Sequence, residues 1–192
     1  MRLERGAELV GGRVLYWMKD FCINCISSQN GEWHVGHFDR KEFSSLRENS
    51  IALLKCEELQ FMINVGKGFS VKAQCVAMNG TFVFSMHRDP DAKMAAIIVV
   101  DAKQKEVFRL STTTHLASCS LSEFAEYLSL SFYSSPKGKE PFDNKLEVFN
   151  LKTGEVIASI NKDDELRHAE IIVTEPDGNV VAFYKGKSFK VC

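Results

Sequence analysis

Residues 145–160 read KLEVFNLKTGEVIASI, and this stretch decides the fold. Apolar and polar residues alternate over 146–151 and again over 155–160, as they do in β-strands that are buried on one face. The tripeptide Lys152-Thr153-Gly154 joins the two segments and has the composition of a short turn. The stretch therefore predicts a β-hairpin.

Strand-like segments of the same kind fill much of the remaining chain. They lie at residues 81–86, 95–100, 106–110, 169–174 and 179–184. Three dipeptides, Asn30-Gly31, Asn79-Gly80 and Asp177-Gly178, stand between apolar segments and supply the positive φ that tight hairpin turns need. Helical periodicity is poor, and we expect only one short helix or turn, near residues 41–49.

The turns recur at a near-constant interval. Gly31 and Gly80 are 49 residues apart, and Gly80 and Gly178 are 98 apart, so a further unit should lie between the last two. Residues 121–129 fit that unit, with Ala125 in the place of the glycine. Asp101 and Asn150, which each end a predicted strand before a polar turn, are also 49 residues apart. A period of about 40–50 residues that holds about four short strands is typical of β-propeller blades.

We therefore predict an all-β fold with about four propeller-like blades of antiparallel strands, in approximate units 1–49, 50–111, 112–161 and 162–192. Repeated hairpins also occur in β-sandwiches and antiparallel barrels, and these and an α+β fold are the alternatives. A closed propeller leaves no edge strand unpaired, whereas four units would leave two open edges. The expectation is an incomplete propeller, which is part of a longer chain or is completed by a partner.

Parts of these units resemble degenerate WD40 repeats. Residues 145–160 resemble the second half of such a repeat, and residues 117–129 and 173–183 resemble the first half, with TEPDGNVVA (174–182) as the closest match. The chain departs from the family at the Trp-Asp pair, where it has Val100-Asp101 and Phe149-Asn150. The resemblance implies a non-enzymatic scaffold that binds protein partners and needs no cofactor.

The composition argues against other classes of partner. The formal net charge is −1 and Lys and Arg are scattered, so the basic patch that nucleic-acid binding requires is missing. The longest apolar run, Met94–Val100, is much shorter than the roughly 20 residues of a membrane helix. The N-terminus has no signal-peptide core, and most of the six cysteines have apolar neighbours. We expect buried free thiols and a cytoplasmic, or alternatively nuclear, protein.

Four residues near the N-terminus are of the types that bind zinc: Cys22, Cys25, His34 and His37. Their spacing differs from that of common zinc fingers, and Asn30-Gly31 places them on a β-hairpin. Core cysteines on a strand are therefore the favoured interpretation, with no metal expected. A small zinc-binding module at the N-terminus is the alternative.

Catalytic motifs are also missing, including the Gly-x-Ser-x-Gly elbow of many hydrolases. A hydrolase or lyase on an all-β scaffold remains the alternative to a scaffold protein, and it would need histidines and acids to converge, with His87, His115 and Asp101 as the first candidates. His115 and His168 each precede a predicted inner strand, where we expect hydrogen bonds within a blade.

Overall fold

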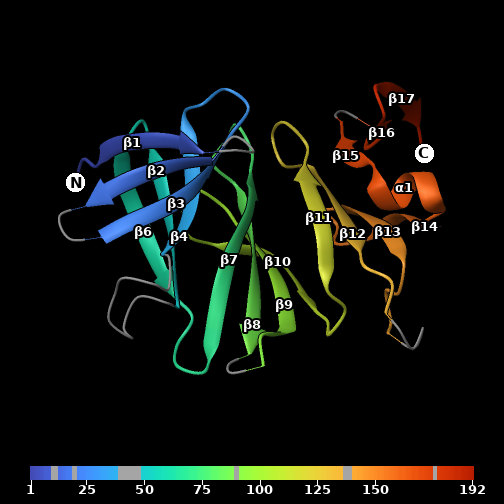
Figure 1. The fold of residues 1–192 in the computed structure, drawn as a ribbon, viewed down its shortest axis with the longest axis horizontal. Helices are drawn as coiled ribbons and strands as arrows, with labels where there is room; N and C mark the ends of the chain where they lie inside the picture. The colour runs from blue at the N-terminus through green and yellow to red at the C-terminus, as the bar shows by residue number, and fades with distance from the viewer. Residues whose placement is uncertain (10–12, 19–20, 39–48, 89–90, 136–139, 175–176) are drawn as a thin grey trace. The chain divides into compact units, whose positions relative to one another are not determined.

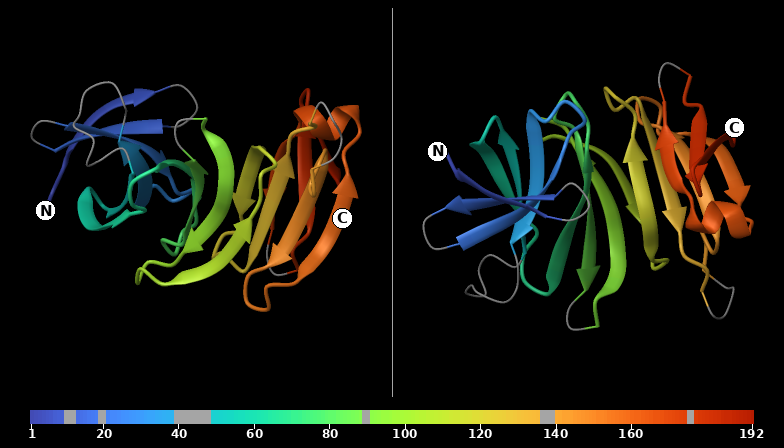
Figure 2. Two further views of the ribbon diagram at one scale, coloured as in Figure 1. Left: turned by 90° about the horizontal axis from the view of Figure 1, so that it is seen from below. Right: turned by 45° about the horizontal axis from the view of Figure 1, so that its top comes forward.

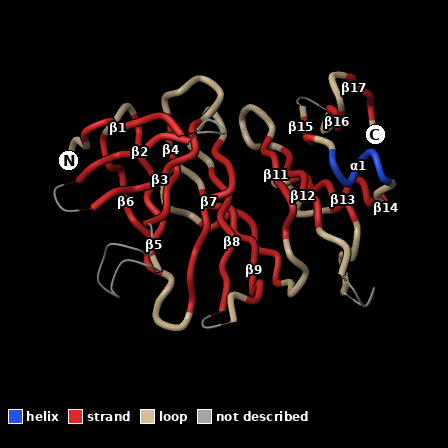
Figure 3. Tube along the Cα trace, in the orientation of Figure 1, coloured by secondary structure: helices blue, strands red, loops and turns tan. Residues whose placement is uncertain are grey.

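The computed structural model describes residues 1–192 except 10–12, 19–20, 39–48, 89–90, 136–139 and 175–176. The described residues lie almost entirely in strands and turns, with one short helix among them (Figure 3). The prediction of an all-β fold of four antiparallel sheets is confirmed. The chain divides into two compact units, Met1–Ser111 and Thr112–Cys192. The expected helix or turn at 41–49 falls, apart from its last residue, outside the described residues.

The first unit contains two sheets, labelled in Figure 1. Sheet A has six strands in chain order: β1 (Glu4–Leu9), β2 (Arg13–Met18), β3 (Phe21–Ser27), β4 (Trp33–Phe38), β5 (Ser50–Lys55) and β6 (Glu58–Asn64). Sheet B has the order β10-β9-β8-β7, with β7 (Phe69–Val76), β8 (Phe82–Arg88), β9 (Lys93–Val100) and β10 (Glu106–Ser111). Sheet A continues past residue 49 because β5 pairs along its length with β4.

One face of sheet A packs against sheet B and forms the main core of the first unit. Strand alternation directs Val35 and Leu53, both 0% exposed, toward sheet B. Sheet B contributes Phe82 and Phe84, whose ring centroids are 6.1 Å apart. Full burial of each such side chain stabilises the fold by about 1.5–3 kcal/mol.

The opposite face of sheet A encloses a second core, because the ends of the sheet are brought together. The N–H of Leu3 donates to the carbonyl of Glu57 at 2.9 Å, and the N–H of Leu59 donates to the carbonyl of Met1 at 2.9 Å. Leu3 is 3% exposed and packs in a cluster with Tyr16 and Ile23. Sheet A thus curls round so that its own strands enclose the side chains on this second face.

The second unit also contains two sheets. Sheet C comprises β11 (Leu116–Leu121), β12 (Tyr127–Phe132), β13 (Lys145–Asn150) and β14 (Val156–Asn161), and the helix α1 (Asp164–His168) leads into sheet D with β15 (Glu170–Val173), β16 (Val180–Tyr184) and β17 (Lys187–Lys190). Leu146 and Val148 of sheet C pack against Val173 and Val180 of sheet D. The two sheets lie side by side in both views of Figure 2.

Equivalent turns recur in all four sheets and confirm the predicted repeat. In each, a residue with positive φ donates its backbone N–H to the carbonyl of the residue that opens the turn, which lies three residues back in sheets A, B and C and four residues back in sheet D. The pairs are Gly31 (φ 71°) to Ser28 at 2.9 Å, Gly80 (φ 82°) to Ala77 at 3.1 Å, Ala125 (φ 61°) to Ser122 at 3.0 Å, and Gly178 (φ 70°) to Thr174 at 3.0 Å. The alignment of Ala125 with the glycines is therefore correct down to the backbone conformation.

The second repeated feature, at Asp101 and Asn150, is a pair of equivalent turns. The Oδ1 atom of Asp101 accepts from the N–H groups of Lys103 and Lys105, both at 2.9 Å. The Oδ1 atom of Asn150 accepts from Lys152 at 2.9 Å and Thr153 at 3.2 Å. Both side chains cap the end of a strand, which is the role for which short polar side chains are suited.

Replacing Ala125 by glycine is expected to raise the free energy of unfolding of the second unit by about 0.5–1 kcal/mol, because an alanine pays a penalty in the left-handed region that glycine does not. Urea denaturation followed by circular dichroism measures the change. Ala158→Gly on β14 is the control, where the same substitution in extended backbone should lower stability. A lower urea midpoint for Ala125→Gly would contradict the assigned conformation.

Candidate binding site

A cleft of about 390 Å³ opens between sheets A and B within the first unit. It is bounded by the end of β6 on one side and by β10 on the other. Its floor is apolar and is formed mainly by Phe69, Phe84, Met86, Ile98 and Val100. This volume lies within the range of about 300–1,000 Å³ that is common for ligand-binding sites.

The cleft owes its shape to the segment that leaves sheet A. The N–H of Val65 donates to the carbonyl of Asn49 at 2.9 Å, which continues the edge of the sheet beyond β6. The side chain of Asn64 donates to Ser50 Oγ at 3.2 Å and accepts from the N–H of Gly66 at 2.8 Å. These bonds hold Val65 as one lip of the cleft.

The opposite wall carries an ion pair. Arg109 donates from Nε to Glu106 Oε1 at 2.9 Å and from Nη2 to Glu106 Oε2 at 2.5 Å. The hydrogen bond from Arg109 lowers the pKa of Glu106, so the carboxylate stays charged at neutral pH. Both side chains are 44% exposed, so solvent screens the ion pair and it contributes little to the stability of the fold. Its main effect is to place charged groups on this wall of the cleft.

The four zinc-type residues lie on sheet A but do not converge. Cys22 and Cys25 are three residues apart on β3, as His34 and His37 are on β4, so each pair points to opposite faces of the sheet. Among the described residues, no group of three or more His, Cys, Asp or Glu side chains is arranged to hold a metal ion. The geometry instead separates the set into Cys25 with His34 on one face and Cys22 with His37 on the other.

His34 lies in a buried hydrogen-bonded chain. Its Nε2 is 3.0 Å from the hydroxyl of Tyr16, and its Nδ1 is 2.9 Å from Ser27 Oγ. Burial raises the pKa of Tyr16 to about 12, and burial followed by the charge of Arg5 lowers the pKa of His34. Both ring nitrogens are engaged, so a neutral imidazole satisfies this chain without a metal.

Stability of the first unit should fall as the pH drops below the ordinary histidine pKa of about 6.5, because the folded state holds His34 neutral while the unfolded state takes up a proton. The stabilisation is fully present above that value and is lost on acidification. Urea midpoints at pH 7.5 and 5.5, read by tryptophan fluorescence, measure it. The double variant His34→Leu with Tyr16→Phe should show a smaller difference between the two pH values; an equal difference would exclude His34 as the cause.

The catalytic candidates are also not brought together within the first unit. His87 pairs with Met94 near one end of β9, whereas Asp101 follows the other end of that strand. His87 Nε2 lies 2.9 Å from the buried Ser85 Oγ, and its Nδ1 lies 3.3 Å from the carbonyl of Ala92. In the second unit His115 and His168 are exposed; as predicted, they precede strands, β11 and β15, and His168 is the last residue of α1.

The cysteines differ in part from expectation. Cys22 and Cys25 are buried, but Cys56 and Cys192 are exposed, and all six are free thiols. Cys56 is exposed because it occupies the tight turn between β5 and β6, where it has φ 46°. Burial raises the pKa of the Cys25 thiol, which is therefore protonated and unreactive at neutral pH.

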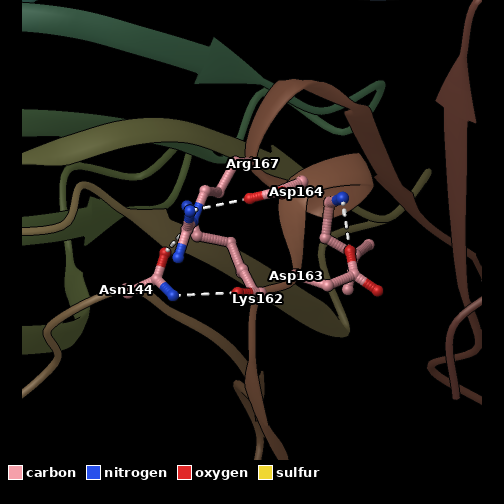
Figure 4. Close-up of polar contacts among 6 residues, drawn as sticks. Asn144, Lys162, Asp163, Asp164 and Arg167 are labelled. Atoms are coloured by element: carbon pink, nitrogen blue, oxygen red, sulfur yellow. Dashed lines mark hydrogen bonds and ion pairs between the residues drawn. The ribbon is translucent and has the colours of Figure 1, made fainter.

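A polar cluster at the junction of β14 and α1 was not indicated by the sequence (Figure 4). Lys162 is 4% exposed, and its ammonium donates to Ser131 Oγ at 2.8 Å. Its carbonyl accepts from Asn144 Nδ2 at 2.8 Å, and Arg167 donates to Asn144 Oδ1 at 3.0 Å and to Asp164 Oδ1 at 2.8 Å. Burial, and then the charge of Arg167, lower the pKa of Lys162. The cluster joins the residue before β13 to the residue after β14 and to α1.

No protein-family model and no curated protein sequence matches the chain. Solved structures do match. The β-propeller domain of Cps50 (Swd1) from Myceliophteria thermophila gives a TM-score of 0.52 at 7% identity, over 91% of this chain and 64% of that one. Hsv2 of Kluyveromyces lactis gives 0.56 at 10% identity, over 97% and 67%.

A third match is KlAtg21 in its complex with the coiled coil of AgAtg16. It gives a TM-score of 0.54 at 11% identity, over 91% of this chain and 61% of that one. This chain thus spans about three-fifths to two-thirds of the length of the structures it resembles. Together with the four sheets and their repeated turns, these matches show that the chain has the WD40-type β-propeller fold.

Proposed function

We propose that this chain is part of a protein-interaction scaffold of the WD40 type, without enzymatic activity, and that the cleft between sheets A and B is where it holds a protein partner. The observation that carries the proposal is a largely apolar cleft of about 390 Å³ between two sheets. KlAtg21, which shares the fold, was solved with a coiled coil of AgAtg16 bound. Fold similarity supports the class of function, whereas the cleft supports its place on this chain.

The setting of this function is also a proposal. Six free thiols in one chain favour a reducing compartment, either the cytosol or the nucleus. The further blades that a closed ring would require come from a longer chain or from a partner. The described part of the chain has no helix with the length and apolar character needed to cross a bilayer.

The proposal is tested by affinity capture with the folded chain and two matched variants. Val65→Trp places an indole in the lip of the cleft, whereas Ile172→Trp adds the same side chain on sheet D, at a residue that is 38% exposed. Circular dichroism first establishes that both variants are folded. We expect the wild-type chain and Ile172→Trp to retain the same partner, and Val65→Trp to retain much less of it.

Two other outcomes are informative. If both variants retain the partner equally, the partner binds outside the cleft, and the proposed scaffold function still holds. If the folded chain retains nothing beyond what an unrelated propeller of similar size retains, the scaffold function itself is contradicted.

A further inference from the structure

Basic residues lie at both ends of the cleft. Arg88 pairs with Phe69 across β8 and β7, so both project from the same face of sheet B, and Phe69 lines the cleft. At the other end, Lys103 and Lys105 flank Gln104, which also lines the cleft, in the turn between β9 and β10. All three basic side chains belong to exposed residues.

The described acidic groups near the cleft are already engaged within the chain. Glu106 is bound by Arg109 in the bidentate pair. Asp101 accepts two backbone N–H groups, and Asp91 lies 3.3 Å from Lys93. The described charged residues named here are five basic ones, Arg88, Lys93, Lys103, Lys105 and Arg109, and three acidic ones, Asp91, Asp101 and Glu106. Their net charge is positive around an apolar floor, and an acidic occupant complements it.

The strands beside the cleft favour an extended polypeptide over a compact apolar molecule. Among the described residues β10 pairs only with β9, so it is an edge strand. β6 is the last strand of sheet A; Glu58 and Leu59 at its start are paired with residues 1–2, so its free edge is the later part, from residue 60 to Asn64 beside the cleft. Edge strands offer backbone N–H and C=O groups that an added strand can satisfy, while the alternate side chains of that strand enter a pocket. A compact apolar ligand would use the floor but neither the edges nor the charges.

We propose that the cleft receives an extended segment of a partner protein in which apolar side chains alternate with acidic ones. The apolar side chains fill the floor between Val65 and Val100, and the acidic ones face Arg88 at one end and Lys103 and Lys105 at the other. This proposal rests on the proposed scaffold function and specifies the partner that the cleft accepts.

The test uses immobilised seven-residue peptides in which Leu or Phe alternates with Asp or Glu, beside matched sets in which Lys or Gln replaces the acidic residues. We expect the purified chain to bind the acidic set at least about tenfold more tightly than the Lys set, which corresponds to about 1.4 kcal/mol. Binding should weaken as salt is raised from 50 to 500 mM, because exposed charges are screened.

Charge reversal locates the site. Arg88→Glu combined with Lys105→Glu should abolish the preference for acidic peptides, whereas Lys187→Glu with Lys190→Glu on β17, which changes the net charge equally, should preserve it. Equal binding of the acidic and Lys sets, or an equal loss in the control variant, would overturn the proposal. A partner captured by the folded chain but insensitive to the cleft variants would overturn this inference and leave the scaffold function standing.

Discussion

Gly36→Ala is expected to lower the free energy of unfolding of the first unit by about 3 kcal/mol, because it overpacks a filled core. Gly36 lies on β4, in the middle of sheet A, directly opposite Cys25. A Cβ atom there would stand 2.4 Å from Cys25 Sγ, 2.4 Å from Ile23 Cγ2 and 2.9 Å from the carbonyl oxygen of Asn24. Ile23 and Cys25 are 0% exposed, so neither side chain can move aside without disturbing its neighbours.

Tryptophan fluorescence isolates this effect, since both tryptophans of the chain belong to the first unit. Gly6→Ala is the matched control. A Cβ atom at Gly6 would stand 2.7 Å from Nε1 of Trp17, but that indole is 43% exposed and can turn away. We expect the control to cost less than about 1 kcal/mol. Equal urea midpoints for Gly36→Ala and the wild-type chain would mean that this core is not packed as described.

The repeat was predictable because its signals are local. A dipeptide such as Asn79-Gly80 specifies a turn through the backbone freedom of its own residues. The number of residues between such turns therefore indicates the length of one repeat unit. Even the substituted turn at Ala125 was identified from its neighbours, and its φ of 61° follows the glycine pattern. The strands on either side were found for the same reason, since alternation is a property of a single segment.

Sheet A was harder to predict because its closure depends on contacts between distant residues. Nothing local in the first three residues shows that Leu3 will bond to Glu57. The same closure explains a departure from the repeat. His34 stands where the other sheets have the buried apolar residues Phe82, Leu128 and Val180 after their turns, and Tyr16 from β2 supplies its partner.

The opposite orientations of the zinc-type residues, by contrast, follow from the local geometry of a strand. Two residues separated by two others on one strand face opposite sides of the sheet, so Cys22 and Cys25 cannot both bind one metal ion from a regular strand. The cleft could not be foreseen in this way. Its lining comes from five strands, β6 to β10, and from Val65 and Gln104 in the segments between strands, and the packing of two sheets decides which side chains meet there.

Trp33→Ala is expected to cost the first unit about 3–5 kcal/mol, the usual range for removing a large buried aromatic side chain. Trp33 is 9% exposed and follows the repeated turn of sheet A. The equivalent turn of sheet B rests on its indole, because a Cβ atom at Gly80 would stand 2.8 Å from the ring. Lys55 Nζ also lies over the indole, 5.0 Å from the centroid of the Trp33 ring. Loss of the indole thus removes the contact that docks one repeated turn on the preceding sheet.

The same arrangement recurs in the second unit, where a Cβ atom at Gly178 would stand 2.8 Å from the ring of Tyr127. An aromatic side chain after one turn and a glycine in the next therefore form a pair that joins successive sheets. Trp17→Ala is the control, since that indole is 43% exposed and should cost less than about 1 kcal/mol. Trp33→Phe should recover part of the loss, because a smaller ring still fills some of the space under Gly80. Equal urea midpoints for Trp33→Ala and Trp17→Ala, measured by circular dichroism, would show that the aromatic–glycine contact does not hold the sheets together.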